Sequence, residues 1–371
     1  MKKLLFTSIF CVGALLSYSQ DKKPVYEFKT AIDLSHTETK NQCMTGTCWS
    51  FATVSFLESE LMRMDKGQHD LSEMFNVRMT YPKKVDKYVR MQGKYQFGPG
   101  SLSHDVINVL EGYGLVPESV YSGRENEKEL YDHGQLDAVL VAVVDAVLEN
   151  NPGNRAYVAA VEGILDAYIG EVPEKFTYEG KEYTPQSFKE SMGLNASDYV
   201  SFTSYTHHPF YEEFILEVPD NFSQGEFMNV PVEDLVSIID NALTEGYTIA
   251  WDADVSEKSF SFRNGIAIIP EDGIKKDQLW KEVVKEKKVT QEMRQETFDN
   301  FTTTDDHLMH LIGKATDQNG TTYYMIKNSW GDGNPYDGIQ YISEEYIKLK
   351  TVGILLHKEG VPKAVRKKAG M

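Results

Sequence analysis

Cysteine is scarce in this chain, with three residues among 371. Cys11 lies in an apolar N-terminal segment that we expect to be removed, which leaves Cys43 and Cys48 five positions apart. Two cysteines this close together in one segment exclude a disulfide framework. Because a free thiol in an exported protein is open to oxidation, we expect at least one of these two thiols to have a chemical role.

Positive charge is also in short supply. The chain has 38 Lys and Arg against 56 Asp and Glu, a formal net charge of −18. An acidic surface repels phosphate backbones and anionic lipids, so we expect no nucleic-acid partner. No repeat with a period of about 20–50 residues is present, which argues against a solenoid. Beyond the N-terminus no apolar run approaches about 18 residues, so we expect no stable membrane span in the mature chain.

The N-terminus has the pattern of a signal peptide. Two lysines precede an apolar segment that ends at Leu16, and Ser17 and Ser19 are the small residues that a signal peptidase requires. We therefore predict a signal peptide at residues 1–19, a single domain at 20–371, and export to the periplasm or the extracellular space. An uncleaved N-terminal anchor is the alternative.

The first half of the chain has helical periodicity. Apolar residues recur every three or four positions across residues 48–64. Residues 134–170 predict two more helices, broken at 150–153 and paired as a hairpin. We expect this hairpin to belong to a helical insertion at about residues 125–230.

The last third has the alternation and β-branched composition of strands, at residues 307–313, 321–327 and 339–342. A helical half followed by a β-rich half predicts an α+β fold. We expect the β-rich half to be barrel-like and the active-site cleft to lie between the two halves.

Cys48 stands at the start of a predicted helix. Unpaired N–H groups and the helix dipole favour a thiolate there, and the thiolate is the nucleophilic form of cysteine. Gln42 lies six residues upstream, where a loop can aim its amide at an oxyanion, and Gly46 lets the backbone pass close to a cleft. We interpret Cys43 as a small loop residue.

A cysteine nucleophile needs a base, and the base needs an orienting partner. His307 on one predicted strand and Asn328 at the end of the next can supply both. His310 lies on the same strand, but side chains three apart on a strand point to opposite faces, which argues against a shared metal ion. We expect His207 and His208 to lie in a loop, and we predict no metal or cofactor.

These residues form a pattern that resembles the papain superfamily. It is carried by four motifs in chain order: Gln42; Gly46-x-Cys48-Trp49; Asp306-His307; and Lys327-Asn328-Ser329-Trp330-Gly331. Within the superfamily the chain is similar to the bleomycin hydrolase and aminopeptidase C branch. The gap of 259 residues from Cys48 to His307 and the segment 100–114 point to that branch.

The resemblance implies a papain-like fold and a cysteine peptidase. It implies that Cys48 is the nucleophile, paired as a thiolate with the imidazolium of His307. It also implies an oxyanion hole made by Gln42 with the Cys48 N–H, an orienting role for Asn328, and shielding of that contact by Trp330.

The resemblance also implies which residues bind substrate: Gly100, Ser101, Asp306, Leu308 and Trp330. Two of them depart from the family pattern. Ser101 replaces a second glycine, and we expect its side chain to narrow the cleft. Leu308 stands where a small residue is common.

Aminopeptidase activity on peptides is the activity that the branch implies. In that branch a C-terminal tail folds into the cleft and restricts cleavage to peptide N-termini, and the enzymes often form a homo-hexamer. Here only 43 residues follow Asn328, and they end in a basic run. An endopeptidase, a catalytically silent peptide-binding protein of the same fold, and an amidase or transglutaminase are the alternatives.

Overall fold

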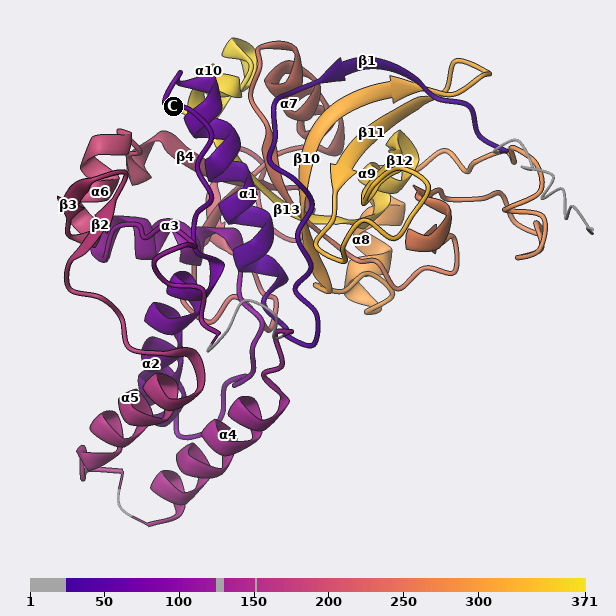
Figure 1. Cartoon of the computed structure of the whole chain (residues 1–371). Helices are drawn as coiled ribbons and strands as arrows, with labels where there is room; N and C mark the ends of the chain where they lie inside the picture. The colour runs from indigo at the N-terminus through magenta and orange to yellow at the C-terminus, as the bar shows by residue number, and fades with distance from the viewer. Residues whose placement is uncertain (1–24, 125–129, 151) are drawn as a thin grey trace, which may run out of the picture.

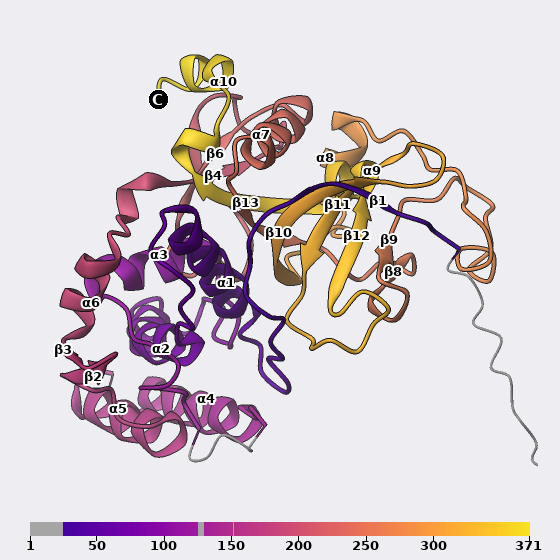
Figure 2. The same cartoon turned by 45° about the horizontal axis from the view of Figure 1, so that its top comes forward.

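The computed structural model describes residues 25–124, 130–150 and 152–371. The predicted signal peptide lies outside these residues. No helix in the described part is both long enough and apolar enough to span a bilayer. The molecule has a helical half and a sheet half, and helix α1 (Cys48–Arg63) lies between them (Figures 1 and 2).

Helix α1 is buried along most of its length. Its described neighbours are α2 and α3 on one side and strands β10 and β7 on the other. A helix that is covered on all sides needs apolar residues around its whole circumference, and this helix has them, from Trp49 to Leu61. The rest of the helical half consists of α2 (Glu73–Arg90), α3 (Ser103–Gly112), α4 (Gly134–Glu149), α5 (Ala156–Ile169) and α6 (Pro185–Met192).

The predicted helical hairpin is confirmed by α4 and α5, which pack against each other. The buried residues of α4 are Leu136, Leu140 and Val144, each four positions from the next, so they form a single stripe. The buried residues of α5 recur at the same spacing, from Tyr157 to Ile169. Each helix buries this one stripe, against the other helix and against α2, which is why the stripe positions predicted the hairpin.

The segment expected as a helical insertion, about residues 125–230, is not helical throughout. After α6 it supplies three strands to the main sheet, and only the small hairpin of β2 (Phe176–Tyr178) and β3 (Lys181–Tyr183) stands apart from that sheet. These three strands have three to five residues each, too short for their alternation to show in the sequence.

The main sheet has eleven strands in the order β5-β6-β4-β13-β7-β10-β11-β12-β9-β8, with β1 pairing on β10. This path of described strands does not close into a barrel, so the β-rich half is barrel-like only in a loose sense. The strands are β1 (Lys29–Asp33), β4 (Tyr199–Thr203), β5 (Glu213–Ile215), β6 (Glu226–Asn229), β7 (Ile249–Ala253), β8 (Phe260–Ser261), β9 (Ile266–Ala267), β10 (His307–Thr316), β11 (Thr322–Lys327), β12 (Ile339–Ser343) and β13 (Thr351–His357).

One face of the sheet packs on the helical half. The other face packs on a second apolar core, to which α7 (Val232–Thr244), α9 (Glu344–Lys350) and α10 (Lys363–Lys368) contribute. Helix α8 (Gln291–Asp299) packs against α9. This arrangement brings the start of α1 to the start of β10, so Cys48 and His307 lie at the same end of the interface between the two halves.

The C-terminus lies at the other end of α1 (Figure 1). Met371 shares a surface pocket with Tyr199, and the Tyr199 ring packs edge-on against Phe56, in the second half of α1. The tail therefore does not enter the region around Cys48.

Candidate active site

Cys48 is the first residue of α1, and its side chain is only half-buried. No side-chain hydrogen bond caps this end of the helix. The hydroxyl of Thr47, which stands at the N-cap position, instead bonds the hydroxyl of Thr45 at 2.6 Å. The positive end of the helix dipole is therefore not neutralised by a cap, and it favours negative charge on the sulfur.

The imidazole of His307 is fixed on two sides. Its Nε2 lies 2.8 Å from Oδ1 of Asn328, and its ring stacks on Trp330 with centroids 4.5 Å apart. The same Oδ1 accepts the backbone N–H of Ser329 at 2.7 Å, which sets the orientation of the amide. Because Oδ1 can only accept, Nε2 of a neutral His307 carries the proton, and Nδ1 is left as an acceptor.

Neighbouring side chains fix the positions of Asn328 and Trp330. The Asn328 amide donates to Gln340 on β12 at 2.6 Å. Phe260 and Phe262 contact the Trp330 ring edge-on, so aromatic side chains cover this edge of the site. The described structure therefore brings together three of the predicted site residues: His307, Asn328 and Trp330.

Cys48 lies against the beginning of β10, where it packs in the same core as Leu308 and the Leu308 backbone opposes the effect of burial on the pKa of the thiol. Leu308 directly follows His307, so the sulfur lies at the beginning of this strand. No direct hydrogen bond between the thiol and the His307 ring is recorded among the described residues.

Burial shifts both titratable groups toward their neutral forms. It raises the pKa of the Cys48 thiol to about 12, with the Leu308 backbone opposing this shift. It lowers the pKa of His307 to about 4, with the Asn328 hydrogen bond opposing. Desolvation thus disfavours the expected thiolate and imidazolium as isolated charges, whereas the helix N-terminus and these hydrogen bonds favour them.

Gln42 lies in the loop before α1 and links it to the loop after β11. Its Oε1 accepts the Ser329 hydroxyl at 2.6 Å, and its Nε2 donates one hydrogen to the Thr45 carbonyl at 2.7 Å. A side-chain amide has two N–H donors, so the second hydrogen remains for another acceptor.

The segment 98–101 forms a wall beside Cys48. Trp49 donates its indole N–H to the Pro99 carbonyl at 3.0 Å, and a Cβ on Gly46 would collide with the Pro99 ring. The buried ammonium of Lys84 bonds the carbonyls of Gly98 and Gly100. Burial lowers the pKa of Lys84 to about 8.

Three predicted substrate-binding residues lie elsewhere than expected. The Ser101 side chain does not narrow the cleft, because it is buried and donates to Asp105 at 2.6 Å. Leu308 is 2% exposed and packs in the core between α1 and the sheet. Asp306 is exposed and turns back to accept from the Val255 N–H and the Thr304 hydroxyl. These positions depend on which way each side chain faces, which the motif does not specify.

Two other sequence candidates lie outside this site. His310 is fully buried on the opposite face of β10 from His307, as predicted, with Nδ1 2.8 Å from the Ser55 hydroxyl. Its Nε2 has no partner among the described residues. Cys43 is a free thiol in the loop before α1, as expected.

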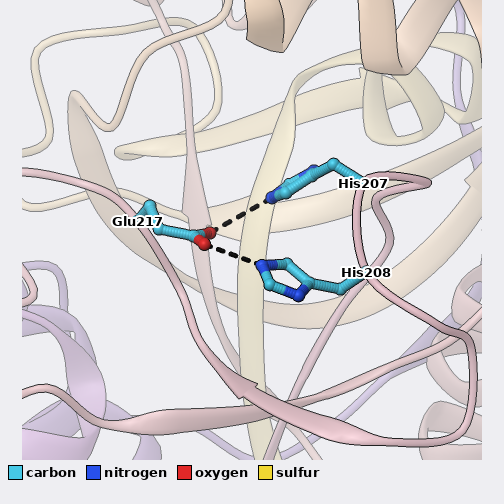
Figure 3. Close-up of side chains that lie close together, drawn as sticks. All are labelled: His207, His208 and Glu217. Atoms are coloured by element: carbon cyan, nitrogen blue, oxygen red, sulfur yellow. Dashed lines mark hydrogen bonds and ion pairs between the residues drawn. The ribbon is translucent and has the colours of Figure 1, made fainter.

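The loop histidines form a cluster with Glu217 (Figure 3). The Nε2 atoms of His207 and His208 lie 3.1 and 2.7 Å from its carboxylate. Gln295 donates its amide N–H to Nδ1 of His207, so Nε2 of that ring carries the proton. The three side chains have the ligand types of a metal site, and in this structure both rings hydrogen bond the carboxylate.

Motif analysis missed the acidic groups around the thiol. The carboxylates of Asp305, Asp252 and Asp220 all lie close enough to raise the pKa of Cys48, after burial. Only Asp305 is next to a motif. The other two come from β7 and from a loop after β5, and no spacing in the sequence connects them with Cys48.

Comparison with known proteins gives the family. Residues 158–371, more than half of the chain, match the profile of the Peptidase C1-like family. Aminopeptidase G of Lactobacillus delbrueckii subsp. lactis is 23% identical over 87% of this chain and 81% of its own length. Aminopeptidase C of Streptococcus thermophilus is 23% identical over 90% of this chain and 83% of its own.

The fold agrees with that of PepW from Lactobacillus rhamnosis. The TM-score is 0.70 at 19% identity, over 92% of this chain and 84% of that one. The predicted resemblance to the aminopeptidase C branch is thereby confirmed. The chain belongs to the Peptidase C1-like family: it is a cysteine-type peptidase with a papain-like fold, similar to aminopeptidase C.

Proposed function

We propose that this protein is an aminopeptidase in which Cys48 is the nucleophile and His307 transfers the protons. One observation carries the proposal: the Cys48 thiol lies at an uncapped helix N-terminus, against the start of the strand whose first residue is His307. The names of the relatives, aminopeptidases G and C, support hydrolysis at peptide N-termini.

The proposed reaction has two stages. The thiol proton passes to Nδ1 of His307, the sulfur attacks the carbonyl carbon of the scissile amide, and His307 returns the proton to the leaving amine. Water then attacks the thioester, with His307 as base, and releases the acid and the thiol. Burial makes the His307 imidazolium a stronger acid than an exposed one, which favours protonation of the leaving amine.

The remaining polar groups have roles in this scheme that follow from their contacts. The Cys48 N–H and the second N–H of the Gln42 amide would stabilise the oxyanion. Asn328 would hold the His307 ring in the tautomer that accepts at Nδ1. Trp330 would keep water from that hydrogen bond.

Endopeptidase activity is the second candidate, because the position of Met371 favours it. With the tail at the far end of α1, the described chain does not block the cleft by its own C-terminus.

A pair of substrates separates the two activities. We expect a fluorogenic alanine amide with a free amino group to be hydrolysed at least about 10-fold faster, in kcat/KM, than its N-acetyl derivative, since loss of a charge-assisted contact costs roughly 1.5–3 kcal/mol. Initial rates at pH 7 measure this ratio. Equal rates, together with cleavage inside an N-acetylated peptide, would establish the endopeptidase instead.

Labelling by the epoxide inhibitor E-64 tests the silent-binder alternative. A protein that binds peptides without catalysis would bind both substrates above, hydrolyse neither, and leave Cys48 unmodified.

A further inference from the structure

Three carboxyl groups from separate parts of the chain converge beside Cys48. Asp252 is on β7, Asp305 lies two residues before His307, and Asp220 is in the loop between β5 and β6. Each raises the pKa of the Cys48 thiol, and Asp305 and Asp220 both raise that of Asp252, so the three groups share one region of the cleft.

The register of β7 fixes the face of the sheet on which Asp252 lies. Asp252 pairs with Leu308 across the sheet, and Ala250, on the same face of β7, packs with Leu308 in the core shared with the helical half. Side chains of cross-strand partners lie on the same face, so the Asp252 carboxyl faces α1. It is 4% exposed, and neither of its oxygens has a hydrogen-bond donor among the described residues.

A buried carboxyl without a donor is costly, and structures usually provide a partner. The nearest candidate is Asp305, which is itself an acid and can pair with Asp252 only by sharing a proton. Burial raises the pKa of Asp305 to about 7. In the described part of the chain, neither group forms an ion pair with a lysine or arginine. The pair is therefore satisfied either by a shared proton or by a cationic donor that a ligand brings.

Asp220 approaches the same region from the segment that contains Gly100. Its carboxylate lies against the Cα of Gly100, where a Cβ would collide with it, and it accepts from the Gln96 amide. Burial raises the pKa of Asp220, and the Lys84 ammonium opposes this shift while it donates to the carbonyls of Gly98 and Gly100. The carboxylate thus lies directly beside the wall that a bound peptide would follow.

We propose that Asp220, Asp252 and Asp305 form the subsite that binds the free α-ammonium of a peptide substrate. The inference rests on the proposed aminopeptidase function and names the groups that would select an N-terminus. An ammonium has three N–H donors, so it can bond more than one of these carboxyls at once, and Asp252 has no donor of its own among the described residues. Met371 itself lies in a surface pocket with Tyr199 and does not supply this anchoring group.

The ligand chemistry is a primary ammonium, which has two sources in a peptide: the N-terminus and a lysine side chain. Three amides distinguish them: alanyl with a free amino group, N-acetyl-leucyl-alanyl, and N-acetyl-lysyl-alanyl. The variants are Asp252→Asn, Asp305→Asn and Asp220→Asn, each of which removes the charge and keeps the shape. Asp272→Asn is the matched control, because Asp272 is 93% exposed and pairs only with Lys287.

We expect each cleft variant to raise KM for the free alanyl amide about 10- to 100-fold with a much smaller change in kcat, as expected for the loss of a charged hydrogen bond. KM for the N-acetyl-leucyl amide should not rise, and Asp272→Asn should match the wild type. Stoichiometric alkylation of Cys48 by iodoacetamide in each variant shows that the fold and the nucleophile are intact. Asp220 lies in a loop, so Asp220→Asn provides a second test should Asp252→Asn fail to fold.

Two results would overturn the inference and are distinct from failure of the proposed function. If the wild type prefers the free amine but all three variants keep that preference, another group anchors the ammonium. If the variants lose activity only on the lysyl substrate, the subsite binds a side chain instead. Failure of the proposed function would show earlier, as equal wild-type rates on the free and acetylated alanine amides.

Discussion

Replacing Cys48 with alanine will reduce hydrolysis of the alanine amide to background, a loss of about 10⁴-fold or more. In the proposed mechanism the Cys48 sulfur forms the acyl intermediate, and the methyl group of alanine cannot replace it. The effect is measured as the initial rate of hydrolysis by the variant, relative to wild-type enzyme whose concentration is known from active-site titration. Thermal unfolding of the variant should be close to that of the wild type, because the Cys48 side chain is only half-buried.

Cys43→Ala is the control for this experiment. This second thiol lies in the loop before α1 and forms no disulfide. In the described structure it donates to the Asn41 carbonyl at 3.4 Å. Its variant should keep full activity and still be alkylated once. Should Cys43→Ala inactivate the enzyme while Cys48→Ala remains active, the nucleophile has been assigned to the wrong cysteine.

Removal of the Gln42 amide should have the next largest effect. We expect Gln42→Ala to lower kcat about 10²- to 10³-fold with little change in KM, because an oxyanion donor acts in the transition state and not on the bound substrate. The effect is measured by steady-state kinetics of both parameters. Gln42→Glu keeps the size of the side chain and the oxygen that accepts from the Ser329 hydroxyl, but it removes the N–H donor. Its kcat should therefore fall as far as that of Gln42→Ala.

Ser329→Ala separates donation from positioning. It removes the 2.6 Å hydrogen bond to Oε1 of Gln42 and leaves the amide N–H groups in place. We expect a loss of less than about 10-fold, since only the orientation of Gln42 is loosened. If Ser329→Ala were as damaging as Gln42→Ala, the importance of Gln42 would be in joining the two loops and not in the oxyanion hole.

Much of the architecture that surrounds Cys48 could be predicted from local pattern. The apolar spacing after Cys48 predicted α1, and the alternation from His307 predicted β10. Both elements are buried on all sides in the structure, and their periodicity still gave the right type of element. Asn328 was placed correctly at the end of the next strand, since β10 and β11 are consecutive and pair directly.

What could not be predicted depends on packing between distant segments. The position of Asp252 beside Cys48 requires the register of β7 against β10, which no periodicity encodes. The Ser101 side chain turns inward because its hydroxyl donates to Asp105, one helical turn later. The motif shows only that a glycine is replaced, and not where the replacing side chain points. The effects of burial on Cys48 and His307 likewise arise only when the two halves of the molecule close over them.

The position of Met371 has a practical consequence for handling the enzyme. Helix α1 has 16 residues, so about 24 Å of helix separate the sulfur end from the end near the last residue. A resin, a biosensor chip or a fluorescent fusion attached through that residue is held well away from the cleft. Immobilisation through the C-terminus should therefore leave peptides free to reach the thiol from solution.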